Sequence, residues 1–215
     1  MTSLTQQLIH FFSALMLLLN FGMLAQRRVL GLIRLLALQG LVLSINIACV
    51  AYAFSLPELY ITMALTLLMK VWLIPFVLRR LLIKLGMQGK IEFIINLPSI
   101  LLIGLALVIF AFNLSNSIMQ SPTNNLSLAL ASVLVSSFML IIKRKAISQV
   151  ISLLSLENSL FFVVSSSTYG MSLVVELGVA FDVLIGLFIF GIFFFKIRDN
   201  FESLDVSHLE QLRED

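Results

Sequence analysis

Charged residues are scarce in this sequence. Only 12% of its 215 residues are Asp, Glu, Lys or Arg, whereas 60% are hydrophobic. A soluble domain of this length needs far more charge on its surface. The composition therefore excludes an ordinary soluble protein and indicates that lipid surrounds most of the chain.

Cysteine and histidine are almost absent. Cys49 is the single cysteine and lies within an apolar run, which excludes an intrachain disulfide, a CxxC pair and an iron–sulfur cluster held by this chain alone. His10 and His208 lie near opposite ends of the chain, so we expect no bis-histidine haem site. The sequence also lacks a Ser/His/Asp set, a metal-ligand cluster and a phosphate-binding glycine loop, and we expect no cofactor and no catalytic site in this polypeptide.

Long hydrophobic runs are abundant instead. A membrane-spanning helix needs about 20 apolar residues, and the sequence contains seven such segments, separated by short connections with Gly, Pro and Ser. No basic stretch precedes the first run and no small-residue cleavage site follows it, so we expect the first helix to be retained. The predicted all-α spans are 7–25, 33–54, 60–78, 93–113, 126–142, 147–166 and 172–195.

The basic residues fix the predicted orientation. The loops near 56–59, 114–125 and 167–171 contain no Lys or Arg, whereas 13 of the 14 basic residues follow the odd-numbered helices. Because cytoplasmic loops are rich in Lys and Arg, we predict an outer N-terminus and a cytoplasmic C-terminus. These basic residues are Arg27, Arg28, Arg34, Arg79, Arg80, Lys84, Lys90, Lys143, Arg144, Lys145, Lys196, Arg198 and Arg213.

The first three and last three predicted helices resemble each other. In both sets a basic cluster precedes the second helix, and a polar residue, Gln39 or Glu157, lies about halfway along it. The third helix of each set carries an ionisable residue near its middle, Lys70 or Asp182. The pattern predicts a parallel tandem repeat joined by the fourth helix.

Three charged residues lie where charge is costly. Lys70, Glu157 and Asp182 are each about ten residues from a helix end, or about 15 Å, which is the middle of a ~30 Å hydrocarbon layer. A charge at that depth costs about 2.5–3.5 kcal/mol on insertion scales. Glu176 is shallower on the helix that carries Asp182.

Two interpretations of these charges stay open. Lys70 can form a structural ion pair with Glu157 or Asp182, or the carboxylates can form a proton relay that a nearby lysine biases. One lysine cannot pair fully with several carboxylates, which favours the relay. Further candidates to line a polar path are Asn20, Gln39, Asn46, Asn158 and the Ser/Thr residues of the fifth and sixth predicted helices. Such groups are more often ordinary interhelical hydrogen bonds.

Four sequence motifs carry a family resemblance. They are LMKVWLIP at 68–75, ISQVI with LEN at 147–151 and 156–158, VELGVAFD at 175–182, and LDV at 204–206. Over nearly its whole length the chain resembles hydrogenase-4 component E. Its last three helices are similar to the K subunit of respiratory complex I and to the C subunit of multi-subunit sodium/proton antiporters.

The resemblance implies a membrane-arm subunit of a formate hydrogenlyase or related group 4 nickel–iron hydrogenase in a bacterial or archaeal cytoplasmic membrane. Glu157 matches the first glutamate of the proton path in those relatives, and Asp182 best matches the second, with Glu176 as an outer companion. The nickel–iron centre and iron–sulfur clusters would belong to partner subunits. In the first repeat, Gln39 and Lys70 replace the expected acids, which puts a relay through that half in doubt.

The sequence therefore predicts a non-catalytic subunit on a proton-translocation path between a redox module and antiporter-like subunits. Its expected contacts are those subunits, the membrane anchor of the redox module, peripheral hydrogenase subunits and lipid, but no nucleic acid. The alternatives are a subunit of a cation/proton antiporter and a purely structural scaffold. The predicted divisions are a first repeat at 1–92, a linking helix and outer loop at 93–125, a second repeat at 126–197, and a cytoplasmic tail at 198–215.

Overall fold

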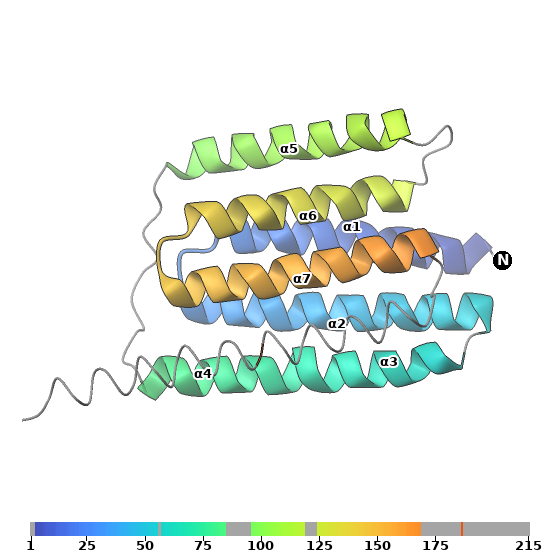
Figure 1. Cartoon of the computed structure of the whole chain (residues 1–215), viewed down its shortest axis with the longest axis horizontal. Coiled ribbons are helices and arrows are strands. Elements are labelled where there is room, and N and C mark those ends of the chain that lie inside the picture. Colours follow the sequence, from blue (N-terminus) through green and yellow to red (C-terminus); the bar gives the residue numbers. More distant parts are fainter. Residues whose placement is uncertain (1–2, 56, 85–95, 119–123, 169–185, 187–215) are drawn as a thin grey trace, which may run out of the picture. The chain divides into compact units, whose positions relative to one another are not determined.

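The computed structural model is an all-α protein over the residues that it describes, namely 3–55, 57–84, 96–118, 124–168 and 186 (Figure 1). The π-helix η1 runs directly from α3 into α4, so these three elements form one continuous third span. The helices α1 to α7 all belong to the compact unit Met1–Val175. Their bounds, in chain order, are α1 (Ser3–Ala25), α2 (Val29–Phe54), α3 (Glu58–Thr66), η1 (Leu67–Leu73), α4 (Ile74–Lys84), α5 (Leu97–Ile118), α6 (Asn124–Ile142) and α7 (Ala146–Thr168).

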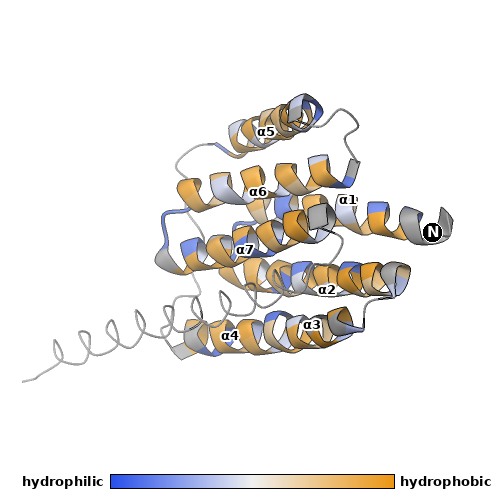
Figure 2. Ribbon diagram, turned by 45° about the vertical axis from the view of Figure 1, so that its right-hand side comes forward, coloured by the Kyte–Doolittle hydropathy of each residue, from blue (hydrophilic) through white to orange (hydrophobic). Residues whose placement is uncertain are grey.

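Six helices among the described residues are long and apolar enough to cross a membrane, which confirms the predicted multi-pass, all-α class. Figure 2 shows hydrophobic residues along most of each helix. The seventh predicted segment, 172–195, lies outside the described residues apart from Gly186. Seven spans, the tandem repeat and the four divisions therefore stay predictions. The six spans are Gln7–Ala25, Val29–Ala53, Leu59–Arg80, Leu97–Ser117, Asn125–Ile142 and Ile147–Ser165.

Local chemistry explains where two of the helices begin or end. The fourth span begins at Leu97 rather than at 93, which places Pro98 in the first turn, where its missing N–H costs no helical hydrogen bond. Asn96 precedes that turn, and its carbonyl accepts the first bond, from the N–H of Ile100 at 3.1 Å. At the end of α2, Ser55 adopts a left-handed conformation, φ 55°, and its N–H donates to the carbonyl of Ala51.

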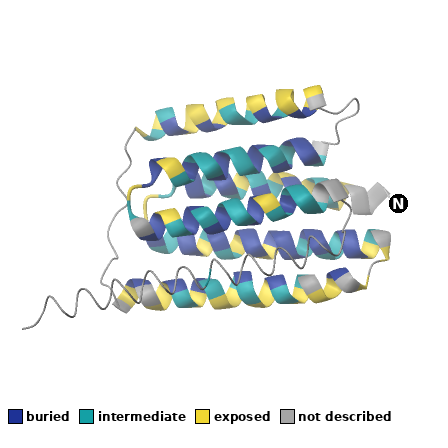
Figure 3. Cartoon of the chain, in the orientation of Figure 1, coloured by how far each residue is buried: buried dark blue, intermediate teal, exposed yellow. Residues whose placement is uncertain are grey.

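Four helices form the buried centre. α1 contacts α2 and α6, and α7 contacts the same two helices, so that the hairpins α1–α2 and α6–α7 pack side by side. Figure 3 shows buried residues concentrated on α2, α6 and α7. An apolar cluster that includes Met16, Leu43, Ile47 and Phe162 fills one part of this bundle.

Two spans lie at the periphery. α5 packs on α1 and α6, and the third span packs on α2. Most residues of both spans are half-buried or exposed (Figure 3). The turns 26–28 and 143–145 and the end of α4 gather at one end of the bundle (Figure 1). We call this the basic end, because it holds Arg27, Arg28, Arg79, Arg80, Lys143, Arg144 and Lys145.

Candidate functional site

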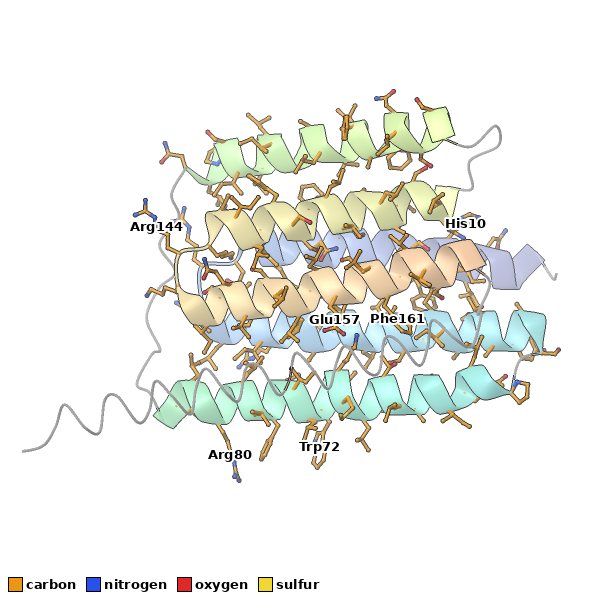
Figure 4. The ribbon with its side chains drawn as sticks, viewed as in Figure 1. His10, Trp72, Arg80, Arg144, Glu157 and Phe161 are labelled. Atoms are coloured by element: carbon orange, nitrogen blue, oxygen red, sulfur yellow. The ribbon has the colours of Figure 1, made fainter. Side chains whose placement is uncertain are left out.

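An ion pair joins two of the charged residues predicted to lie at the same depth. Lys70, in the middle of η1, donates from Nζ to Oε1 of Glu157 on α7 at 3.1 Å. The side chains are 5% and 11% exposed. Figure 4 places Glu157 on the side of α7 that faces the third span. The structure therefore brings together residues that are 87 positions apart in the sequence.

The helix that carries Lys70 widens around it. The N–H of Ile74 donates to the carbonyl of Met69, five residues earlier, as in a π-helix. Pro75 follows directly, has no N–H to donate, and would clash with the carbonyl four residues before it in a regular α-helix. The wider turn before Pro75 removes that conflict. Such π-helical turns occur frequently at functional sites.

Gly40 lets α2 approach the widened turn closely. A Cβ atom at Gly40 would lie 3.0 Å from the Cβ of Lys70 and 3.3 Å from its carbonyl carbon and oxygen. A side chain there would push the lysine backbone away from α2. Gly40 is therefore part of what holds Lys70 in reach of α7.

Glu157 is only partly satisfied by its partner. Its Oε1 accepts from Lys70, whereas its Oε2 is buried and has no hydrogen-bond partner among the described residues. Phe161, one helical turn further along α7, places its ring centroid 5.4 Å from Nζ of Lys70. The ammonium group thus meets a carboxylate and an aromatic face presented by the same side of α7.

A second polar cluster occupies the centre of the four-helix bundle. Oδ1 of Asn20 accepts from Nε2 of Gln39 at 2.9 Å and from Oγ of Ser155 at 2.9 Å. Its Nδ2 donates to Oγ of Ser159 at 3.2 Å, and Oγ of Ser136 lies 3.2 Å from Oδ1. All five side chains are buried. Asn20 therefore connects α1 to α2, α6 and α7.

The predicted polar-lining residues divide between this cluster and its surroundings. Gln39 joins it, and Nδ2 of Asn158 donates to Oε1 of Gln39 at 3.4 Å. Asn46 is buried two turns away, and its Nδ2 has no hydrogen-bond partner among the described residues. Glu176 and Asp182 lie outside the described residues, so their place near Lys70 stays a prediction.

The sequence carries a signal for this cluster, because Asn20 and the serines of α6 and α7 are among the residues that it offers for a polar path or for interhelical hydrogen bonds. Serines on α7 recur at 148, 152, 155 and 159, which places them along one helix face, and Ser132 and Ser136 do the same on α6. The serines alone did not specify Asn20 as their common partner, because only the packing of α1 against α6 brings it there.

Lys143 differs from its neighbours in burial. The sequence predicts residues 143–145 to set the topology and contact lipid headgroups, but the side chain of Lys143 is 0% exposed and faces the protein. Its Nζ donates to the carbonyls of Met23 and Gln26, at 3.2 and 3.1 Å. These carbonyls end α1, where a cation is favourable. Burial lowers the pKa of Lys143 to about 8.

Metal chemistry has no obvious site in this part of the protein. Within the described ranges, no group of three or more His, Cys, Asp or Glu side chains is placed to hold a metal ion. A lysine and a carboxylate in contact, such as Lys70 and Glu157, can exchange a proton or rearrange their ion pair.

Comparisons with known proteins assign no family to this chain. No protein-family model and no solved structure matches it. The chain is similar to an uncharacterized protein of Mycobacterium tuberculosis, Rv0085, with 30% identity over 125 residues. The match covers 56% of this chain and 57% of that relative, so the chain spans little more than half of the relative's length.

Proposed function

We propose that this multi-pass membrane protein is a non-catalytic subunit of a group 4 hydrogenase or formate hydrogenlyase type of complex. In this proposal it contributes charged residues to a proton path between the redox module and antiporter-like subunits. Glu157 and Lys70 form the part of that path in the described residues, and Asp182 and Glu176 extend it. The nickel–iron centre and the iron–sulfur clusters belong to partner subunits.

The observation that supports the proposal is the incomplete pairing of a buried carboxylate. Glu157 uses one oxygen for Lys70 and leaves the other buried without a hydrogen-bond partner among the described residues. A buried polar atom without a partner costs about 1–3 kcal/mol, and more where the group is charged. Among the described residues, Glu157 differs in this from Asn46, Ser115 and Ser148, whose unpartnered atoms belong to neutral side chains. An oxygen that receives a proton during turnover explains why the cost is tolerated.

The ion pair also favours a second candidate, the structural scaffold. A Lys70–Glu157 contact of 3.1 Å between buried side chains is also what a bundle that only neutralises its charges would contain. An antiporter subunit without a redox module would use the same pair. Co-purification separates these candidates from the proposal more directly than any geometric argument.

The first experiment is mass spectrometry of the complex isolated in mild detergent from native membranes. The proposal expects nickel–iron hydrogenase subunits and large antiporter-like subunits in fixed ratio to this chain. If only antiporter subunits co-purify, the chain belongs to an ion exchanger without a redox module, and the hydrogenase assignment is rejected. Isolation of the chain without either class would reject the hydrogenase assignment.

The second experiment measures coupling in inverted membrane vesicles. Glu157→Gln should keep electron transfer to an artificial acceptor while reducing proton uptake into the vesicles several-fold. Gln149→Ala, on an exposed position of the same helix, is the matched control and should change neither. Unchanged proton uptake in Glu157→Gln vesicles would reject the relay, and recovery of uptake in a Lys70→Met/Glu157→Met double variant would establish the scaffold.

A further inference from the structure

The two peripheral spans expose different chemistry although they are almost equally exposed. Only 17% of α5 and 18% of the third span is buried, against 56% of α2. The exposed face of α5 is mainly aliphatic, as at Leu102, Leu105 and Ile109. The exposed face of the third span instead carries Trp72 and Phe76, followed by Arg80. Figure 4 shows Trp72 and Arg80 pointing away from the bundle. The third span therefore differs from α5 chiefly in exposing a tryptophan in the same row as an arginine.

The three side chains form an ordered row that we call the aromatic stripe, Trp72–Phe76–Arg80. They are four residues apart and therefore lie along one face of the helix. The rings of Trp72 and Phe76 stack with centroids 6.2 Å apart and an interplanar angle of 18°. The Arg80 guanidinium carbon lies 4.6 Å from the Phe76 centroid. Tryptophan, tyrosine and arginine are the residues that dominate binding energy at protein interfaces.

Trp72 is at an unusual depth for a residue that faces lipid. It precedes Arg80 by eight residues, or about 12 Å, inside a span that runs from Leu59 to Arg80. Tryptophan is enriched at the membrane–water interface, where its indole N–H finds a hydrogen-bond acceptor. The side chain of Trp72 is 67% exposed, and no hydrogen bond joins its N–H to another described residue. Hydrocarbon offers no acceptor to this N–H, whereas a protein partner does.

We propose that the aromatic stripe docks a transmembrane helix of a different subunit. That helix presents an acceptor at the depth of Trp72 and an acidic side chain beside Arg80. A second copy of this chain does not fit this surface. Two copies inserted in the same orientation and related by an axis normal to the membrane would place Arg79 and Arg80 of one copy against the same arginines of the other, and these like charges repel. The inference goes beyond the proposed function, because it requires a membrane partner but no particular redox module.

The test uses photo-crosslinking of the full chain in native membranes. Phe76 is replaced by p-benzoylphenylalanine, and Phe110 on α5, which is 56% exposed against 46% for Phe76, is the matched control. We expect one discrete adduct at position 76, at least ten-fold more abundant than any protein adduct at position 110. Its crosslinked peptide should belong to another polytopic subunit and contain Asp or Glu near the end that faces the basic end of this chain.

A charge reversal tests the acidic contact. Arg80→Glu should reduce the adduct at position 76 at least five-fold, whereas Arg34→Glu, at an exposed position of α2, should not change it. An adduct with a second copy of this chain, lipid adducts alone at position 76, or equal protein adducts at 76 and 110 would overturn the inference. A crosslinked partner outside any redox or antiporter complex would retain the docking surface and reject only the proposed function.

Discussion

Replacing Lys70 or Glu157 alone should destabilise the protein far more than replacing both. The two charged atoms are 3.1 Å apart and nearly inaccessible. At an effective dielectric constant of about 20, their attraction is about 5 kcal/mol. Lys70→Met removes the cation that faces the Glu157 carboxylate, and Glu157→Met removes the carboxylate that faces Nζ of Lys70. The loss of one partner of a buried pair costs about 3–5 kcal/mol.

The double variant Lys70→Met/Glu157→Met removes both charges and needs neither partner. Replacement of a buried pair by apolar residues of similar volume is often close to neutral, so we expect its free energy of unfolding to lie within about 2 kcal/mol of the wild type. The two single effects are then strongly non-additive, as expected for groups in direct contact.

Unfolding in mixed micelles, followed by circular dichroism over a range of sodium dodecyl sulfate fractions, measures all four proteins of this cycle. The control cycle uses Ser13→Ala and Asn125→Leu, whose uncharged contact of 3.3 Å also bridges two helices. That coupling should be about 0.6 kcal/mol, as for an average membrane hydrogen bond. Single effects below about 1 kcal/mol, or a double effect equal to the sum of the singles, would refute the buried ion pair.

The remaining predictions concern how the bundle is held together. Gly40→Leu should lower the thermal midpoint in detergent by several degrees, because the new leucine side chain would collide with Lys70. Gly22→Ala should lower the midpoint much less, because the added Cβ would lie 3.7 Å from the side chain of Leu35. Asn20→Leu removes the partner of Gln39, Ser155 and Ser159 and should cost about 1–3 kcal/mol in the same unfolding assay; Asn113→Leu, an exposed position, should stay within about 0.5 kcal/mol. Lys143 should make stability rise with pH between about 8 and 10.5, because its pKa falls from an ordinary 10.5 to about 8 on folding and the unfolded chain therefore binds more protons in that range. The rise, on the order of 3 kcal/mol at most, should disappear in Lys143→Met, and an equal rise in that variant would assign it to other groups.

The sequence predicted the spans because long apolar runs constrain membrane helices strongly. Insertion requires enough apolar residues to cross the hydrocarbon and requires backbone groups to be bonded within each helix. The helix bounds were less certain, since they depend on local chemistry such as Pro98 in the first turn of α5. Composition alone could not predict the π-helix around Lys70, although Pro75 indicated an irregularity close to it.

Side-chain partners were harder to predict than depth. Counting residues placed Lys70 and Glu157 at a similar level, and their contact in the structure agrees with that count. The count could not decide between Glu157 and Asp182 as the partner of Lys70, because helix order in the sequence does not determine which helices touch. The burial of Lys143 could not be predicted for a related reason, since its bond to the carbonyl of Met23 depends on how two turns distant in the sequence pack together.

The third span carries both Lys70 of the buried ion pair and the exposed aromatic stripe. Lys70 and Trp72 are two residues apart in η1, yet Lys70 is buried toward α7 and Trp72 is exposed on the outside of the bundle. A partner bound at the aromatic stripe would therefore lie about one helix diameter, ~10 Å, from the ion pair. Because η1 is already widened before Pro75, a small change in its winding would move both side chains together. Docking on the outer face and proton occupancy at Glu157 would then be coupled through one helix, so that a variant of the stripe such as Trp72→Leu should alter proton uptake even though it removes no ionisable group.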